Sequence, residues 1–386
     1  ALQSEGLLSD RGGNTQFLAT DGVERFPRVG PAVLGGAPAF FIWGAQPVTV
    51  LDWVGQEYIP QLLDGFLNPQ KRVSLIYLAV AAAITIGWSL FMSGGVARKA
   101  IDHARRGLFG RHLWMSRSAH GDYKLLLANH AVLLLIAPFF VSKMAVATAL
   151  FFFLTEYLPA GTAILASASP LAVAIAYTAF LFVLDDFSRF ATHFALHRIP
   201  VLWAFHKVHH SAETLNPLTV YRTHPVEAIV FSFRAIAVQS VSISLFVFLF
   251  GSSVDLVSVY GVNVILFLFN ATGSNLRHSH VQIRYGARVE KFLISPAQHQ
   301  IHHSMDPRHR DRNFGAALAI WDWMAGSLCV ADKNMELKFG LGRNQATQTH
   351  RLRYLYFSPF GELLSSGKIG TNPVNLNLRD WKKNAI

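Results

Sequence analysis

The stretch DDFSRFATHFALHRIPVLWAFHKVHHSAETLNPLTVYRTHPVE, residues 185–227, holds six of the 17 histidines in the chain. Interpreted as helix, its segments HFALH (193–197) and HKVHH (206–210) space histidines three or four residues apart, and HQIHH (299–303) repeats that spacing. Residues at those separations share one helix face, so each segment can direct its imidazoles at one point. The predicted ligands are His193, His197, His206, His209, His210, His299, His302 and His303.

Clustering of this kind predicts a metal site. Eleven histidines lie between His193 and His303, counting both ends, and neutral imidazole is a good ligand for Fe, Zn, Cu and Ni. The single cysteine, Cys329, excludes an internal disulfide, a cysteine-rich zinc module and a four-cysteine iron–sulfur centre within this sequence. Redox chemistry in this chain would therefore depend on the histidines.

The composition indicates a membrane protein. The chain is 52% hydrophobic and 15% charged, with a mean hydropathy of +0.31, which is more apolar than a soluble average. The formal charge of +11 does not indicate nucleic acid, because lysine and arginine gather beside the apolar runs as they do in cytoplasmic loops of membrane proteins. Runs suited to crossing helices of about 20 residues lie at 73–94, 125–154, 171–191, 226–250 and 254–269.

The charge distribution predicts the orientation of these spans. Seven basic residues lie from Arg98 to Lys124, and the histidine-bearing loops are also basic, so the positive-inside bias places both in the cytoplasm. We expect an all-α integral membrane fold of about five transmembrane helices, with a cytoplasmic helical cap carrying the metal site. The C-terminus is expected in the cytoplasm and the N-terminus on the opposite side. Arg234, early in the fourth span, is expected to reach back to the interface.

The ordered set HFALH, HKVHH and HQIHH resembles the fatty acid hydroxylase / sterol desaturase superfamily of membrane di-iron enzymes. RTHPVE, SPAQHQIHHS and NFGAALAIWDWMAGS strengthen the resemblance, which covers residues 172–330. The composite is specific, whereas a single HxxHH would be weak. We expect an irregular or interfacial N-terminal segment (1–72), a membrane-embedded catalytic domain similar to this family (73–330) and a basic cytoplasmic C-terminal tail (331–386).

One departure from the family pattern leaves the ligand set open. The family often has a histidine beside a Ser-Asn pair before the last cluster, but here a glycine precedes that pair and the histidines come later. The resemblance therefore leaves His278 and His280 as candidate metal ligands, and Asn275 could act through a water. His224 in RTHPVE matches a family position, but the resemblance gives it no definite metal role.

The resemblance implies O2 activation at two irons, which zinc can replace on the same imidazoles, and hydroxylation of an unactivated C–H bond in a lipid acyl chain or sterol. Desaturation on the same site is the alternative. Such chemistry needs a cofactor because no side chain performs it. Asp186, two turns before His193, could orient a ligand imidazole or pair with Arg189. Asp311 and Asn313 match family segments and are expected either to be structural or to support the ligands, and not to be catalytic.

Two other classes of protein compete with an oxygenase. A zinc hydrolase uses three protein ligands and a nearby general base, but no HExxH segment supplies that base. A membrane metal transporter or sensor places its site near the bilayer midplane, whereas these clusters follow apolar runs within basic loops. Metal identity and stoichiometry distinguish the three classes.

The resemblance also implies an external source of electrons, because hydroxylation with O2 consumes two of them. The sequence has no G-x-G-x-x-G fingerprint at a strand–helix turn, no His-Pro-Gly-Gly segment and too few cysteines for a ferredoxin cluster. We therefore expect a separate ferredoxin, rubredoxin or cytochrome with its reductase. An acidic carrier would be attracted to the basic loops.

Overall fold

The computed structural model describes residues 29–34, 37–42, 48–158, 162–251, 255–259, 262–332, 335–342 and 350–365. This part of the chain is mostly helical, as the sequence predicts. Its longer helices are α2 (Ile59–Leu67), α3 (Leu75–Met92), α4 (Ala97–Phe109), α6 (Arg117–Ile136), α7 (Lys143–Tyr157), α8 (Pro170–Arg198), α9 (Pro200–His210), α10 (Pro225–Phe250), α11 (Val264–Ala271) and α14 (Leu352–Ser365). The shorter ones are α1 (Val50–Trp53), α5 (Arg111–Trp114), α12 (Pro296–His302) and α13 (Ile320–Met324).

Two small antiparallel sheets depart from the expected all-α fold. β1 (Val29–Leu34), β2 (Ala37–Ile42) and β3 (Val48–Thr49) form one, and β4 (Ser258–Val259) pairs with β5 (Val262–Asn263). The first sheet lies in the compact unit Ala1–Val50, and Leu51–Ile386 forms a second unit. The described residues of segment 1–72 are thus not irregular, because valine, isoleucine and phenylalanine favour the strands and a continuous helical run follows from α1 to α2.

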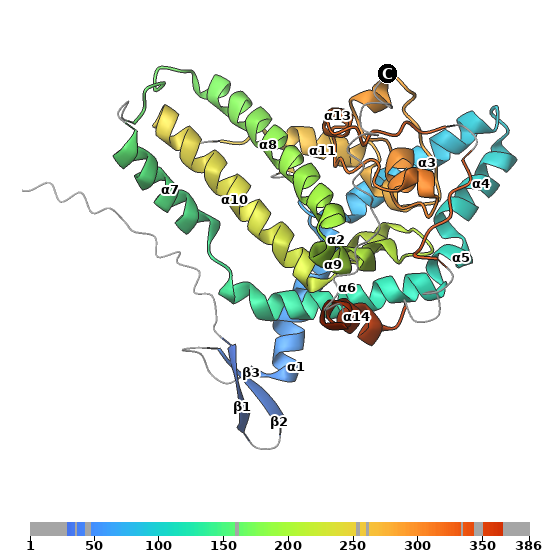
Figure 1. Ribbon diagram of the computed structural model, residues 1–386, viewed down its shortest axis with the longest axis horizontal. Coiled ribbons are helices and arrows are strands. Elements are labelled where there is room, and N and C mark those ends of the chain that lie inside the picture. Colours follow the sequence, from blue (N-terminus) through green and yellow to red (C-terminus); the bar gives the residue numbers. More distant parts are fainter. Residues whose placement is uncertain are drawn as a thin grey trace, which may run out of the picture. The chain divides into compact units, whose positions relative to one another are not determined.

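Four helical segments of the described chain are long and apolar enough to cross a membrane: α3, the run from α6 to α7, α8 and α10. α10 lies between α7 and α8 and packs against both (Figure 1). Large apolar side chains on these helices point outward, including Phe152, Leu171, Ile175 and Phe233. An apolar exterior of this kind is stable when the surrounding solvent is lipid, so the chain is a membrane protein.

The structure retains the second predicted span as one kinked run and corrects the fifth. The second, 125–154, is divided where Pro138 lies in the 3₁₀ turn Ala137–Phe139 after α6, and Ser142 then caps α7, since proline cannot donate a helical hydrogen bond. The fifth, 254–269, holds β4, β5 and the 8-residue helix α11. That helix is about 12 Å long, far less than the hydrocarbon core of about 30 Å, so the five-crossing count is not supported.

The segment before α3 contacts the histidine-bearing part of the fold. Arg72 Nη2 donates to the Ser274 carbonyl (3.1 Å), and Asn275 Nδ2 donates to the Arg72 carbonyl (2.9 Å). Ala81 of α3 packs in one cluster with Leu276. The predicted topology placed the residues before α3 across the membrane from the metal site, and these contacts contradict that placement.

Arg234 lies inside the protein rather than reaching back to the interface. Its Nη1 atom is 2.7 Å from Asp185 Oδ1 and donates to Ser188 Oγ at 2.6 Å. The side chain is only 8% exposed. A buried guanidinium needs a paired carboxylate, and α8 provides one, so Arg234 joins α10 to α8.

The segment predicted as a cytoplasmic tail contains a packed helix. α14, from that segment, packs against α9 and α6. Leu355 is fully buried with Leu125 of α6 and Val208 of α9. The part of 331–386 that the structure describes therefore belongs to the compact region around the histidines.

Candidate metal centre

Nine histidines from four separate elements converge in two groups, and within each group the candidate ligand nitrogens all lie within 4.8 Å of one another. Eight of the nine are buried and His193 is half-buried. The first group consists of His193, His197, His206, His210 and His302. The second group consists of His209, His278, His299 and His303.

Each His-x-x-His-His segment supplies both groups. On α9, His206 and His210 face the first group and His209 faces the second. On α12 and its C-cap, His302 joins the first group, whereas His299 and His303 join the second. A helix turns about 100° per residue, so positions four apart nearly coincide while their neighbour points elsewhere. The expectation that each segment aims at one point is confirmed for HFALH, whose two histidines share the first group. It is wrong for the segments on α9 and α12, which each contribute to both groups.

Both helices begin in a way that the sequence explains. α9 and α12 each have proline in the first turn, where a missing N–H costs nothing. On α12 the Ser295 hydroxyl accepts from the Gln298 amide, and the Gln298 side chain accepts from the Ser295 amide. This capping box fixes the helix start, so His299 and His302 are held on a rigid turn.

The ring nitrogens lie at the separations that a shared cation requires. The Nε2 atoms of His278, His299 and His303 are 3.1 to 3.2 Å apart in each pair, and those of His193 and His206 are 3.2 Å apart. Imidazole donors about 2.1 Å from one ion would be separated by roughly 3.0 to 3.4 Å. Three mutually close Nε2 atoms cannot satisfy one another, because a neutral imidazole carries only one N–H.

The first group also holds buried nitrogens that lack partners. The Nε2 atoms of His197, His210 and His302 have no hydrogen-bond partner within the described part of the chain. Buried polar atoms are almost always satisfied, and three of them facing one point would be satisfied by one metal ion. The donor atoms of each group therefore fit a metal.

Two carboxylates hold rings of the first group from behind. Glu227 Oε1 lies 3.0 Å from His206 Nδ1, and Asp311 Oδ1 lies 3.4 Å from His197 Nδ1. A carboxylate on the second nitrogen fixes the tautomer and makes the ligating nitrogen more basic. Asp311 thus has a place for the supporting role expected of it. Glu227 was missed, although a carboxylate just inside an apolar helix, in RTHPVE, is a recognisable signal.

Backbone carbonyls hold three further rings by their Nδ1 atoms. Each carbonyl accepts from the ring, which leaves Nε2 as the free lone pair. The pairs are His193 with Phe314 O at 2.9 Å, His302 with Arg312 O at 2.8 Å and His209 with Arg222 O at 3.2 Å.

Of the two open candidates, only His278 lies in a group. It ends the 3₁₀ helix Ser274–His278 and joins the second group. His280 lies outside both groups, with its ring centroid 5.9 Å from that of His112 and 5.8 Å from that of Phe339. The structure therefore distinguishes His278 as a ligand candidate from His280, which the sequence alone could not do.

The remaining candidates, His224, Asn275 and Asp186, lie outside both groups. His224 caps α10 by accepting from the Val226 amide, and Asn275 donates to the carbonyl before α3. Asp186 accepts from the amides of Ala317 and Leu318 (2.7 and 3.0 Å). Among the described residues, Asp186 neither contacts a ligand imidazole nor pairs with Arg189. It anchors the loop that follows Phe314 instead.

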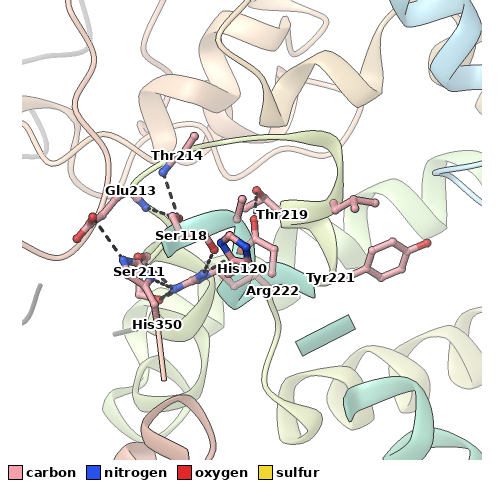
Figure 2. Close-up of polar contacts among 12 residues, drawn as sticks. Ser118, His120, Ser211, Glu213, Thr214, Thr219, Tyr221, Arg222 and His350 are labelled. Carbon is pink, nitrogen blue, oxygen red and sulfur yellow. Dashed lines mark hydrogen bonds and ion pairs between the residues drawn. The ribbon is translucent and has the colours of Figure 1, made fainter. Parts of the chain in front are cut away.

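Arg222 is fully buried and ties three parts of the chain together (Figure 2). Its Nη1 atom donates to the Ser118 carbonyl (3.1 Å) and to Asp122 Oδ1 (2.9 Å) in α6. Its Nη2 atom contacts Ser211 Oγ after α9 (2.9 Å) and His350 Nδ1 (3.0 Å). This network fixes the end of α9, which carries ligands of both groups.

The same residue reaches the second group through its backbone. The Arg222 carbonyl accepts from His209, so displacement of Arg222 would also displace that ring. Space around the guanidinium is tight, because a Cβ added at Gly121 would lie 2.7 Å from Arg222 Nη1. This role could not be predicted from the sequence, since a buried Arg–Asp pair between residues 100 positions apart leaves no local pattern.

A cavity of about 470 Å³ opens beside the first group. Three ligand candidates of that group line the cavity: His197, His210 and His302. His303 of the second group also lines it. Trp203 covers His197, with ring centroids 4.9 Å apart. Further lining residues are Lys207, Ser304, Met305, Asp306, Arg310, Asp311, Gly340, Leu341, Gly342 and Glu362.

Burial keeps the imidazoles in the form that binds metal. It lowers the pKa of His206 to about 3 and that of His209 to about 4. Burial, followed by repulsion from neighbouring histidines, holds the pKa of His210 and His303 well below the usual 6.5. These rings are therefore neutral at pH 7, which is the ligating state.

Comparison with known proteins agrees with this geometry. Residues 178–327 match the family model for fatty acid hydroxylase. An alkylglycerol monooxygenase from Danio rerio is 28% identical over 172 residues, covering 44% of this chain and 33% of the relative. One from Homo sapiens is 30% identical over 168 residues, covering 43% and 32%. The chain thus spans about a third of the length of these curated relatives, and no solved structure matches it significantly.

Proposed function

We propose that the chain is an O2-dependent membrane oxygenase, because its residues 178–327 match the family model for fatty acid hydroxylase. It hydroxylates an unactivated C–H bond of a lipid. The observation that carries this proposal is the convergence of nine histidines in two neighbouring groups. Each group holds one iron, and zinc can occupy the same nitrogens.

Two irons would supply the O2 activation and one-electron chemistry that side chains cannot provide. The chain itself supplies orientation and exclusion of water. Glu227 and Asp311 hold the rings of His206 and His197 from behind, which keeps both ligating nitrogens aimed at the first group. We assign the approach of the substrate C–H bond to the cavity beside His302, which opens onto the first group.

The lipid class is proposed from the membrane character and from the relatives. The apolar exteriors of α8 and α10 place the fold in a bilayer, where a lipid substrate is already concentrated. The relatives are named as alkylglycerol monooxygenases, so a glycerol ether lipid is the first substrate to test. Acyl chains and sterols are the next.

The test compares lipid extracts from cells that express the wild-type chain or His302→Ala. We expect lipids that have gained one oxygen only with the wild type, because His302 is a first-group ligand candidate. Loss of two hydrogens instead would identify a desaturase on the same site. Identical lipids in both cultures, with the wild type fully loaded with iron, would contradict the lipid oxygenase.

The electrons come, in this proposal, from a separate ferredoxin, rubredoxin or cytochrome with its reductase. The basic face of α4, with Arg98, Lys99 and Arg105 exposed, provides a surface that attracts an acidic carrier. Turnover by the purified chain should therefore require added carrier and reductase. Sustained turnover without any electron donor would contradict the oxygenase.

From the basic residues beside the apolar helices we infer that the metal centre and α14 face the cytoplasm. Accessibility labelling of tags in sealed vesicles tests this orientation. The same experiment locates the N-terminus, which the four candidate spans put on the same side as the metal centre. Labelling of a tag after α14 only from the non-cytoplasmic side would overturn the orientation.

A further inference from the structure

A second cavity, of about 170 Å³, is lined by three arginines and by none of the nine grouped histidines. Arg72 comes from the turn before α3, Arg189 from α8 and Arg277 from the 3₁₀ helix that ends at His278. We call it the arginine pocket. Its apolar wall is formed by Phe182, Leu266 and Phe269.

Both carboxylates of the arginine pocket are already engaged. Asp185 lies 2.6 Å from Arg189 and 2.7 Å from Arg234. Asp186 accepts from two backbone amides and, at 2.9 Å, from the indole N–H of Trp321. Four guanidinium groups thus meet two carboxylates, and positive charge is in excess at this place.

Arg72 and Arg277 carry that excess. Among the described residues, each contacts a backbone carbonyl and no carboxylate: Arg72 Nη2 donates to Ser274 O, and Arg277 Nη2 donates to Ala316 O. Arg72 Nε is buried without a hydrogen-bond partner in the described chain. Arg277 is 4% exposed, and its guanidinium carbon lies 4.6 Å from the ring centroid of Phe269.

A neighbouring cation also disfavours the charge of Arg72. Burial, and then the charge of Arg189, lowers the pKa of Arg72 to about 10. Arg72 remains charged at pH 7, and the guanidinium of Arg277 lines the same cavity. Like charges of this kind are costly to bury without a counter-charge. An anion between them would relieve that cost.

The position of the pocket indicates where such an anion comes from. Arg72 lies three residues before the apolar helix α3, and Asp185 stands where the apolar stretch 171–184 of α8 ends. Charged residues at the ends of apolar runs lie at the level of lipid headgroups. Phe182 and Leu266 add an apolar wall on the same cavity, which suits an amphiphile better than a small ion.

We propose that the arginine pocket binds the phosphate of an anionic lipid headgroup, with Arg72 and Arg277 as its principal donors. Guanidinium forks match phosphate oxygens in pairs, and such charge-assisted bonds are stronger than neutral ones. The glycerol end of the lipid lies against Phe182 and Leu266. The site is separate from the metal groups, so this proposal does not depend on the oxygenase activity.

The test measures thermal unfolding of the full chain in a neutral detergent during titration with dioctanoyl phosphatidic acid. A ligand that binds only the folded state raises the Tm by mass action. Dioctanoyl glycerol, which has the same chains and no phosphate, should give no shift. Inorganic phosphate should give a shift only at far higher concentration, because it lacks the apolar contacts.

Variants locate the site. Arg72→Gln and Arg277→Gln should each weaken phosphatidic acid binding by about tenfold or more, the scale of a lost charge-assisted bond. Arg105→Gln, at an exposed position of α4, is the matched control and should bind as the wild type does. Unchanged metal content in each variant shows that it is folded.

A measurement on the wild type alone guards against variants that fail to fold. Native mass spectrometry of the protein with an equimolar mixture of phosphatidic acid and diacylglycerol should retain the former selectively. Equal retention of both lipids would overturn the proposal, as would full affinity in both pocket variants. If inorganic phosphate raised the Tm as much as phosphatidic acid at the same concentration, the pocket would be a site for a free anion and the lipid proposal would be wrong.

Discussion

The two histidine groups use the same ligand chemistry in different surroundings. Three of the five histidines in the first group line the cavity, His197, His210 and His302, whereas only His303 of the second group does. Carboxylates approach two rings of the first group, including His206. Within the described chain, no carboxylate lies within ion-pair distance of a ring in the second.

This difference indicates that the first group is accessible to a ligand and that the second is held mainly by the surrounding protein. The first group faces space in which a ligand can approach, and its carboxylate partners increase the basicity of its imidazoles. The second group is more enclosed, and its contact to the scaffold passes from His209 to the backbone of the buried Arg222. We infer that the first group meets the substrate and that the second depends more on the packing around α6 and α9.

Loss of a ligand histidine should give the largest loss of activity, and it should remove iron only from the group to which that histidine belongs. His197→Ala should abolish activity and lower iron to about one ion per chain, because binding requires the complete donor set. His209→Ala should do the same from the other group. Iron per chain, measured on purified protein, checks both variants.

His280→Ala is the matched control for those variants. Its ring lies beside His112 and Phe339, outside both groups, so iron content and activity should stay at the wild-type level. Loss of iron in His280→Ala together with full retention in His209→Ala would reverse the assignment of the second group.

Breaking the anchor of the second group should give the next largest effect. Asp122→Asn removes the carboxylate paired with the fully buried Arg222, and an uncompensated buried charge costs about 3–5 kcal/mol. Thermal unfolding should show a marked fall in Tm, with iron lost first from the second group. Asp306→Asn, which breaks the exposed pair with Arg308, is the control, and an equal fall there would contradict the argument.

The carboxylates behind the first group should give a smaller effect. Glu227→Gln should lower iron affinity or activity by about 10–100-fold, the usual range for partners of ligating imidazoles. Asp311→Asn should cost less, because its contact to His197 is longer, at 3.4 Å against 3.0 Å. Iron titration of the two variants ranks them, and a larger loss in Asp311→Asn would contradict the ranking.

The smallest expected effect concerns electron delivery, which reaches the groups from the protein surface. With a fixed acidic carrier, the rate should fall several-fold as ionic strength rises, because exposed charges are screened beyond about 10 Å at 0.1 M salt. Iron content should not change over the same range. A salt-independent rate would assign the basic loops to membrane orientation alone.

The sequence predicted the ligand-bearing segments well because helix spacing is local. HFALH, HKVHH and HQIHH all lie on helices or their caps, and all eight of the histidines first predicted fall within the two groups. Their division between two groups could not be predicted, since it depends on how α8, α9 and α12 approach one another. That arrangement also decides which carboxylates reach the rings, so RTHPVE could mark Glu227 as a charged residue inside an apolar helix but could not show its contact with His206.

Which of His278 and His280 belongs to a histidine group could be decided only from the backbone conformation. Gly273 has a φ of +113°, which side-chain-bearing residues rarely adopt, and the 3₁₀ helix that follows carries His278 into the second group. A glycine in place of the family's usual histidine is thus consistent with this turn. The sequence shows the glycine but not the direction in which the chain leaves it.

Hydropathy overestimated the number of membrane spans because it does not register contacts between residues far apart in the sequence. The run 254–269 is apolar, yet Asn263 inside it donates to the Thr178 carbonyl of α8 and caps α11. A buried amide that bonds to a neighbouring helix ends one element and starts another. Such contacts lie far apart in sequence and are invisible to a window of hydropathy.

The most direct test of the central claim is a count of metal in the purified wild-type chain after anaerobic reconstitution with Fe(II). Two complete histidine groups predict two irons per chain, with spectroscopic signs that the ions are neighbours. A single tightly bound zinc that iron cannot replace, or one iron that survives removal of either group, would contradict the account.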